Sequence, residues 1–270
     1  MSNIVKRLES VDYEHPLDRE ALKMIKRLPL LDTIVQAYIN FWMKMNVKVA
    51  IHGNDMLVTP ETFPRVHRLK QKALQRLNLP QDYPVYMHLE WDYDAYVVGV
   101  DHPVIVLNSY LVQDFTDDEL LFVLGHEMGH IKSGHILYYQ MVKMIVNRAS
   151  RFTHALLTAG MQLALFEWAR KSELTADRAG LLVCGDTGVA CSAMAKLMGV
   201  ATDAKYFTPS MESIIEQAEG LDMADAQWNS KIIYFIATSL MSHPWLSLRI
   251  NEIQKWGQTE QYHDVSKLIF

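Results

Sequence analysis

The 270-residue chain is poor in cysteine, with two residues, Cys184 and Cys191. Their spacing matches neither a cysteine zinc pair nor a redox motif, and two thiols cannot build a disulfide framework. Residues 1–20 are charged throughout and lack the apolar stretch of a secretion signal. We therefore expect a reducing, cytoplasmic location.

Excess positive charge and long apolar runs are also missing. The chain has 26 Lys and Arg against 31 Asp and Glu, a net charge of −5, so it offers no basic surface for nucleic acid. Between residues 131 and 172 the longest uncharged apolar stretch is Ala155–Phe166, about 12 residues where a membrane span needs about 20. We predict two packed helices there, with a turn near residues 147–153. A hairpin that dips into a membrane surface is the alternative, so membrane association stays open.

Half of the residues are hydrophobic, enough for a sizeable core in one large or two small domains. Residues 1–80 favour helices, at Leu17–Leu28, at Leu30–Met45 beyond Pro29, and from Thr59-Pro60 to about Pro80. A strand follows at Pro84–Glu90. We expect residues 1–80 to form an accessory layer packed on residues 81–270, within one compact unit.

The most informative pattern is His126-Glu127-Met128-Gly129-His130. Histidines four apart on a helix project from the same face, one turn apart. Both can bind one zinc ion, and the glutamate between them then lies beside the coordination position left open for water. The alternative is a buried helix with two core histidines.

The residues around this pattern predict a strong helix. Thr116 and Glu119 form a capping box at its expected start, and acidic residues occupy its first turn. Gly125 and Gly129 each weaken a helix by about 1 kcal/mol relative to alanine. A glycine kept at such a cost often allows another backbone to approach closely.

A catalytic zinc site needs a third protein ligand. A third histidine six residues after the second is excluded, because that position holds Ile136. His135 is one residue short, so we expect it to play a structural or supporting part. Glu173 and Asp177, four apart on a later helix, can face one way, so that one binds zinc while the other accepts the N–H of a ligand histidine. The alternative is a solvated acidic pair.

These motifs in order, with Ser242-His243-Pro244 and then Arg249 downstream, resemble the M48 peptidases. The M48 peptidases are gluzincin-type zinc endopeptidases that include the Ste24, HtpX and Oma1 groups. The similarity runs from about Tyr83 to Ile253.

The resemblance implies a role for each matching residue. One Zn²⁺ would be bound by His126, His130 and Glu173. Glu127 would be the general base, and Asp177 would orient a histidine ligand. His243 would stabilise the oxyanion, and Arg249 would be the basic residue that follows it in the family.

The fold expected from the motifs is α+β, a mostly helical zincin-like metalloprotease core with a small β-sheet beside the HExxH helix. The expected activity is hydrolysis of peptide bonds in extended or unfolded polypeptides. Two alternatives stay open: a catalytically silent, zinc-stabilised scaffold of the same fold, and a membrane-associated quality-control protease. The sequence does not indicate the oligomeric state.

Two further strands are predicted at Tyr96–Val100 and Val104–Leu107, joined by residues 101–103. Extended peptides bind enzymes by pairing with an edge strand. We therefore expect Tyr96, Val97, Val98 and Gly99 to bind substrate, the alternative being an ordinary core strand.

Overall fold

A computed structural model describes residues 7–28, 31–38, 53–146, 158–199, 213–214, 216 and 246–270. The helices before the HExxH motif are α1 (Ser10–Tyr13), α2 (Pro16–Ile25), α3 (Leu31–Tyr38), α5 (Pro64–Arg76) and α6 (Ser109–Asp114). The others are α7 (Asp117–Lys132), α8 (Ile136–Val146), α10 (Ala159–Cys184), α11 (Thr187–Leu197), α14 (Leu246–Gly257) and α15 (Glu260–Ser266). The strands are β1 (Met56–Leu57), β2 (Val85–His88), β3 (Ala95–Val98) and β4 (Val104–Asn108). The predicted class, mostly helical α+β with one small sheet, is confirmed.

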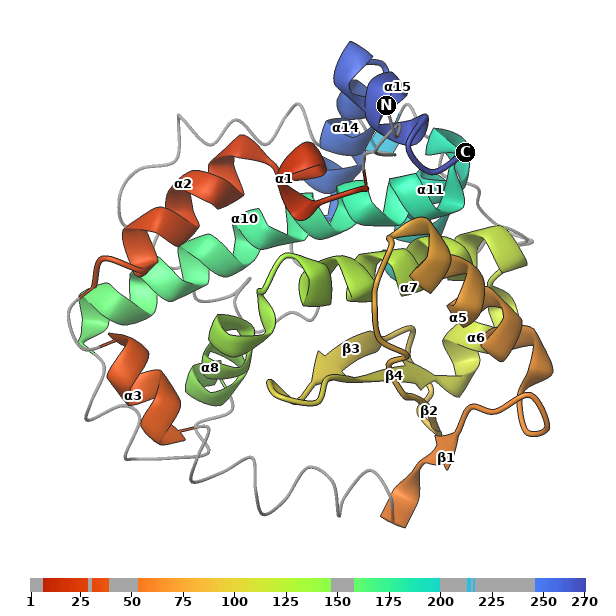
Figure 1. Ribbon diagram of the computed structural model, residues 1–270, viewed down its shortest axis with the longest axis horizontal. Helices are drawn as coiled ribbons and strands as arrows, with labels where there is room; N and C mark the ends of the chain where they lie inside the picture. The colour runs from red at the N-terminus through yellow and green to blue at the C-terminus, as the bar shows by residue number, and fades with distance from the viewer. Residues whose placement is uncertain are drawn as a thin grey trace, which may run out of the picture.

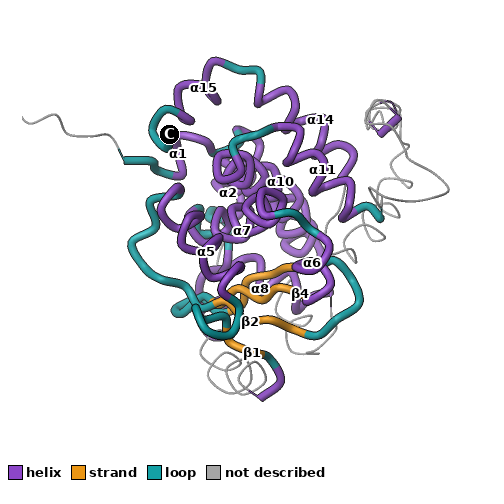
Figure 2. The backbone as a smooth tube through the Cα atoms, turned by 90° about the vertical axis from the view of Figure 1, so that its right-hand side faces the viewer, coloured by secondary structure: helices purple, strands orange, loops and turns teal. Residues whose placement is uncertain are grey.

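The elements form layers around two long helices (Figures 1 and 2). The sheet lies on one side of α7, and α10 lies along the other side. Helix α2 packs on α10 on the far side from α7, and α14 also packs on α10. Helix α7 is therefore central, and every residue from Glu119 to His130 is buried.

The sheet has the strand order β1-β2-β4-β3. β2 runs parallel to β4, whereas β1 and β3 are antiparallel to their neighbours, so β3 forms the edge of the described sheet beside α7. Its burial alternates: Ala95 and Val97 belong to the main core, and Tyr96 and Val98 lie on the opposite face. The two strands predicted around residues 101–103 are thus confirmed as an antiparallel pair.

The predicted start of α7 is confirmed. The Thr116 hydroxyl accepts a hydrogen bond from the Glu119 amide, and the Glu119 carboxylate accepts one from the Thr116 amide, which closes the capping box. The expected close approach of another backbone is confirmed too. A Cβ added at Gly125 would lie 2.5 Å from the Cβ of Val183 on α10. A Cβ added at Gly180 would lie 2.9 Å from the carbonyl oxygen of Phe122 on α7.

One helix start was predicted wrongly. Helix α5 begins at Pro64, with proline at its first position, and not at Thr59-Pro60. The Thr59 hydroxyl accepts hydrogen bonds from the amides of Glu61 and Thr62, while the Thr62 hydroxyl donates to the carbonyl of Leu57. These side chains satisfy the main chain locally and form a separate turn before the helix.

The two helices predicted between residues 131 and 172 are confirmed as α8 and α10, which pack together. Their connection, where the turn was expected, lies outside the described residues. In the described ranges, each helix is too short or too polar to cross a membrane.

The close contact of α7 with α10 predicts that Gly180→Ala destabilises the protein. The new methyl group would collide with the main chain of Phe122, and such overpacking costs about 1–3 kcal/mol, more than the roughly 1 kcal/mol that alanine gains in helix propensity. The free energy of unfolding in urea measures the difference. Gly160→Ala is the matched control, because its site on α10 is open and the variant should be neutral or slightly more stable. Equal stability of both variants would contradict the packing.

Candidate metal centre and active site

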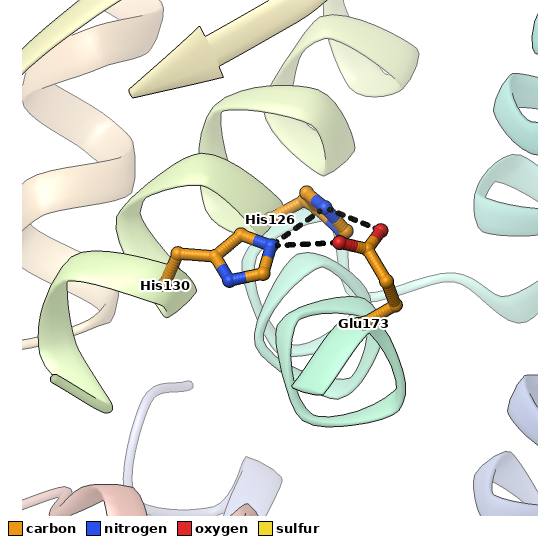
Figure 3. Close-up of side chains that lie close together, drawn as sticks. All are labelled: His126, His130 and Glu173. Atoms are coloured by element: carbon orange, nitrogen blue, oxygen red, sulfur yellow. Dashed lines mark hydrogen bonds and ion pairs between the residues drawn. The ribbon is translucent and has the colours of Figure 1, made fainter. Parts of the chain in front are cut away.

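His126, His130 and Glu173 converge between α7 and α10, all buried (Figure 3). The Nε2 atoms of the two histidines are 3.2 Å apart. Nε2 of His130 lies 3.4 Å from Oε1 of Glu173, and Nε2 of His126 lies 3.5 Å from Oε2. One ligand atom from each residue lies within 4.8 Å of the other two, a spacing at which one metal ion can contact all three.

Asp177 fixes the protonation of His126. Its Oδ1 lies 3.0 Å from Nδ1 of His126, one turn along α10 from Glu173. Burial raises the pKa of Asp177, but the charge and hydrogen bonds of Arg249 outweigh burial and lower it, so the carboxylate is ionised and can only accept. The proton of neutral His126 therefore sits on Nδ1, and Nε2 carries a lone pair.

This arrangement fits a metal ion. The Nε2 lone pair of His126 faces a carboxylate oxygen of Glu173, and two acceptors cannot form a hydrogen bond with each other. A cation between them satisfies both. Two neutral imidazoles and one carboxylate are a donor set that suits zinc and leaves one coordination position open.

Arg249 supplies the positive charge of the buried site. Its Nε and Nη2 donate to the two carboxylate oxygens of Asp177 at 2.7 and 2.6 Å. Its Nη1 lies 2.9 Å from Oε2 of Glu173. Burial raises the pKa of Glu173, but the charge of Arg249 and contacts with the histidines outweigh it and hold the pKa well below its usual value.

Glu127 lies beside this cluster and is 4% exposed. Burial, together with the negative charge of Glu173, raises the pKa of Glu127 well above its usual value. It borders a small hollow. The hollow is lined by Ala95, Leu111, Phe122, Val123, His126, Glu127, Leu197 and Arg249. A carboxyl group with a raised pKa in such a place is suited to take up and release a proton.

Two residues of α8 that the motifs did not single out reach the site. Tyr139 donates a hydrogen bond from its hydroxyl to Oε1 of Glu173 at 3.2 Å. The ammonium of Lys143 lies 4.6 Å from the ring centre of Tyr96 on β3. The available signal was a single charged residue, Lys143, in an otherwise uncharged helix, but the direction of its side chain could not be predicted.

The structure brings His126, Glu127, His130, Glu173, Asp177 and Arg249 together, and it places β3 beside them through Ala95. His243 lies outside the described residues. The roles assigned to these residues, and to Tyr96, Val97, Val98 and Gly99, stay predictions.

The Arg249 geometry predicts that Arg249→Met lowers the free energy of unfolding of the metal-free protein by about 3–5 kcal/mol, because two buried carboxylates lose their partner. Urea denaturation in the presence of a chelator measures the loss. Lys255→Met on the same helix removes an exposed ion pair with Glu252 and should cost at most about 1 kcal/mol. Similar losses in the two variants would be evidence against the buried pairing.

Stability of the metal-free protein should also fall with acid. Burial is the main cause that lowers the pKa of His130 from 6.5 to about 4, so the unfolded chain binds this proton first as pH falls. Between pH 6.5 and 4 this histidine alone should remove roughly 3 kcal/mol, as one pKa unit corresponds to about 1.4 kcal/mol. Urea unfolding at several pH values tests it, and His130→Gln should flatten the profile. An equally steep profile in that variant would refute the assignment.

Comparison with known proteins matches residues 60–257 to peptidase family M48. The plastoglobule-localized metallopeptidase 48 of Arabidopsis thaliana is 27% identical over 98% of this chain and 77% of its own length. Protease HtpX of Ectopseudomonas mendocina is 22% identical over 83% of each chain, and the HtpX homolog of Ralstonia pickettii is 21% identical over 87% of this chain and 88% of its own. No solved structure gives a significant match. The family match covers most of the chain and contains each site residue named above, so this chain belongs to peptidase family M48 and is a metallopeptidase.

Proposed function

We propose that the chain is a zinc-dependent endopeptidase that hydrolyses extended or unfolded polypeptides. The observation that carries the proposal is the convergence of two imidazole nitrogens and one carboxylate beside a second carboxyl group, that of Glu127. A metal site with a purely structural role has no need of a buried glutamate with a raised pKa at its margin. The geometry therefore favours catalysis over a silent scaffold.

His126, His130 and Glu173 would hold the zinc ion, which when bound would supply a Lewis acid for a water molecule and a peptide carbonyl. Glu127 accepts the proton of the attacking water and passes it to the leaving nitrogen, for which a raised pKa suits it. Asp177, held by two hydrogen bonds from Arg249, keeps the ring of His126 in place. His243 is proposed to donate to the oxyanion, as in the family it resembles.

Substrate is proposed to bind as an added strand along β3. The Asn108 amide donates to the Asp94 carbonyl, so alternate residues, Tyr96 and Val98, pair with β4. The main-chain groups of Ala95 and Val97 consequently point away from β4. Ala95 also lines the hollow beside Glu127, which supports this edge as the place where a peptide passes the catalytic base.

The binding edge has a defined end within this proposal. Gln140 of α8 donates a hydrogen bond from its side chain to the Val97 carbonyl at 2.9 Å. A peptide that pairs beyond Ala95 must displace this amide or stop there.

The expected cytoplasmic location remains part of the proposal, and both cysteines are free thiols, as a reducing compartment would keep them.

The central test is Glu127→Gln. The amide cannot take up a proton, so kcat/KM on a reduced, alkylated and therefore unfolded protein should fall by about 10²–10⁴-fold. Zinc content, measured on the same samples, should stay at one ion per chain, and a chelator should abolish the parent activity.

Glu260→Gln, an exposed change at the start of α15, is the matched control and should cleave like the parent. A Glu127→Gln enzyme as fast as the parent would remove Glu127 from the mechanism. A parent that carries zinc but cleaves no unfolded protein would sink the proposed activity.

A further inference from the structure

The side chain of His135 is turned back toward the metal centre by the end of α7. The amide of Gly134 donates to the carbonyl of Ile131, and the amide of His135 donates to the carbonyl of His130. This pair of bonds is a Schellman motif, which needs a left-handed residue, and Gly134 has φ +71°. Nδ1 of His135 thereby lies 3.0 Å from Nδ1 of His130. We expected a structural or supporting part for His135 on the assumption that the helix continues past it. Helix α7 instead ends at Lys132, so the turn at Gly134 sets the direction of the His135 side chain.

The other nitrogen of His135 faces Asp18, a residue of α2 that is fully buried. Nε2 lies 3.1 Å from Oδ2 of Asp18, off the ideal hydrogen-bond line. Asp18 also accepts hydrogen bonds from Trp168 Nε1 at 3.0 Å and from the Thr175 hydroxyl at 2.6 Å. Burial raises its pKa, but His135 and Thr175 outweigh burial and lower it, so all three neighbours face an ionised acceptor.

We propose that Asp18 is a positioning residue for the metal centre, acting through His135 on His130. The inference rests on the proposed zinc site. An ionised Asp18 requires the proton of His135 to sit on Nε2, which leaves Nδ1 as an acceptor. The proton of His130 then sits on its own Nδ1, and the Nε2 lone pair of His130 is turned to the metal.

The opposite proton arrangement would disable the ligand. If His135 carried its proton on Nδ1, it would donate to Nδ1 of His130, and Nε2 of His130 would hold a proton where the metal must bind. Each histidine ligand therefore has a carboxylate that sets its tautomer. Asp177 acts directly on His126, and Asp18 acts on His130 through one intervening ring. Groups that orient metal ligands in this way typically change metal affinity 10–100-fold.

Asp18 lies outside the part of the chain matched to the family, residues 60–257. Helix α2 begins at Pro16, and its preceding residue, His15, donates its amide to the Thr175 hydroxyl at 3.0 Å. Thr175 of α10 thus contacts both the residue before α2 and the carboxylate of Asp18 within α2. These two contacts attach α2 to α10, the helix that carries Glu173.

The first test reads the tautomers in the metal-free parent. Long-range ¹H–¹⁵N spectra of histidine-labelled protein, assigned with His130→Gln and His135→Gln, show which ring nitrogen carries the proton. We expect Nδ1 for His130 and Nε2 for His135, and the reverse pair overturns the proposal. In Asp18→Asn the amide offers an N–H to His135, so both protons should move to the other nitrogen.

The second test measures affinity for Zn²⁺ by competition with a fluorescent chelator. Asp18→Asn should bind Zn²⁺ about 10–100-fold more weakly than the parent. Glu20→Gln is the matched control, because it makes the same acid-to-amide change at an exposed position of α2, and its affinity should equal that of the parent. Equal affinities of Asp18→Asn and the parent, or equal weakening in both variants, would overturn the proposal.

A double variant tests whether the effect passes through His135. In a His135→Leu background, which itself weakens binding, Asp18→Asn should cause no further loss of Zn²⁺ affinity, whereas an additive loss contradicts the relay. Neither readout uses peptide hydrolysis. Parent protein with the expected tautomers and affinities but no peptidase activity would refute the proposed function alone, and active parent with the reverse tautomers would refute this inference alone.

Discussion

The site depends on how closely α7 and α10 approach each other. Two of the proposed ligands come from one helix and the third from the other, and their donor atoms lie within 4.8 Å of one another. Helices usually pack with their axes 8–10 Å apart, with side chains between them. Here Gly125 and Gly180 leave no side chain at the crossing, so the backbones approach directly. The helix propensity given up at these glycines is thus a condition for the three side chains to meet in the buried centre of the fold.

The close approach of α7 and α10 brings several negative charges together. The second constraint on the site is how these charges are balanced. Glu127, Glu173 and Asp177 are all buried within one cluster. Arg249 pairs with two of them, which lowers their pKa values and keeps them ionised as acceptors or ligands. Within the described part of the chain Glu127 has no arginine partner, and its pKa is raised. The geometry of one arginine therefore separates two carboxylates that are held ionised from a third, Glu127, whose raised pKa suits its proposed part as proton carrier.

The features that could be predicted from the sequence are those that are determined within one helix or strand. The capping box, the alternating strands and the shared face of Glu173 and Asp177 follow from spacing along one element, and the sequence predicted them. The start of α5 was missed because threonine hydroxyls compete for main-chain groups, which helical periodicity does not reveal. The supporting part of Asp18 could not be predicted, since its contact with Thr175 joins residues 157 positions apart. The division of the chain near residue 80 stays a prediction.

Contacts between residues far apart in the sequence connect the candidate metal centre to the packing of α2 and α14. His126 depends on Asp177 and Arg249 of the carboxyl-terminal half, whereas His130 faces His135 and, through it, Asp18 of α2. A ligand that binds only the folded state stabilises that state, and the contacts that orient its donor atoms share in the stabilisation. Zinc should therefore hold α2 and α14 on α10 more firmly than packing alone. Conversely, loosening either helix should weaken the site without touching a ligand. Under the proposed ligand assignment, metal affinity and the docking of α2 and α14 are one linked equilibrium.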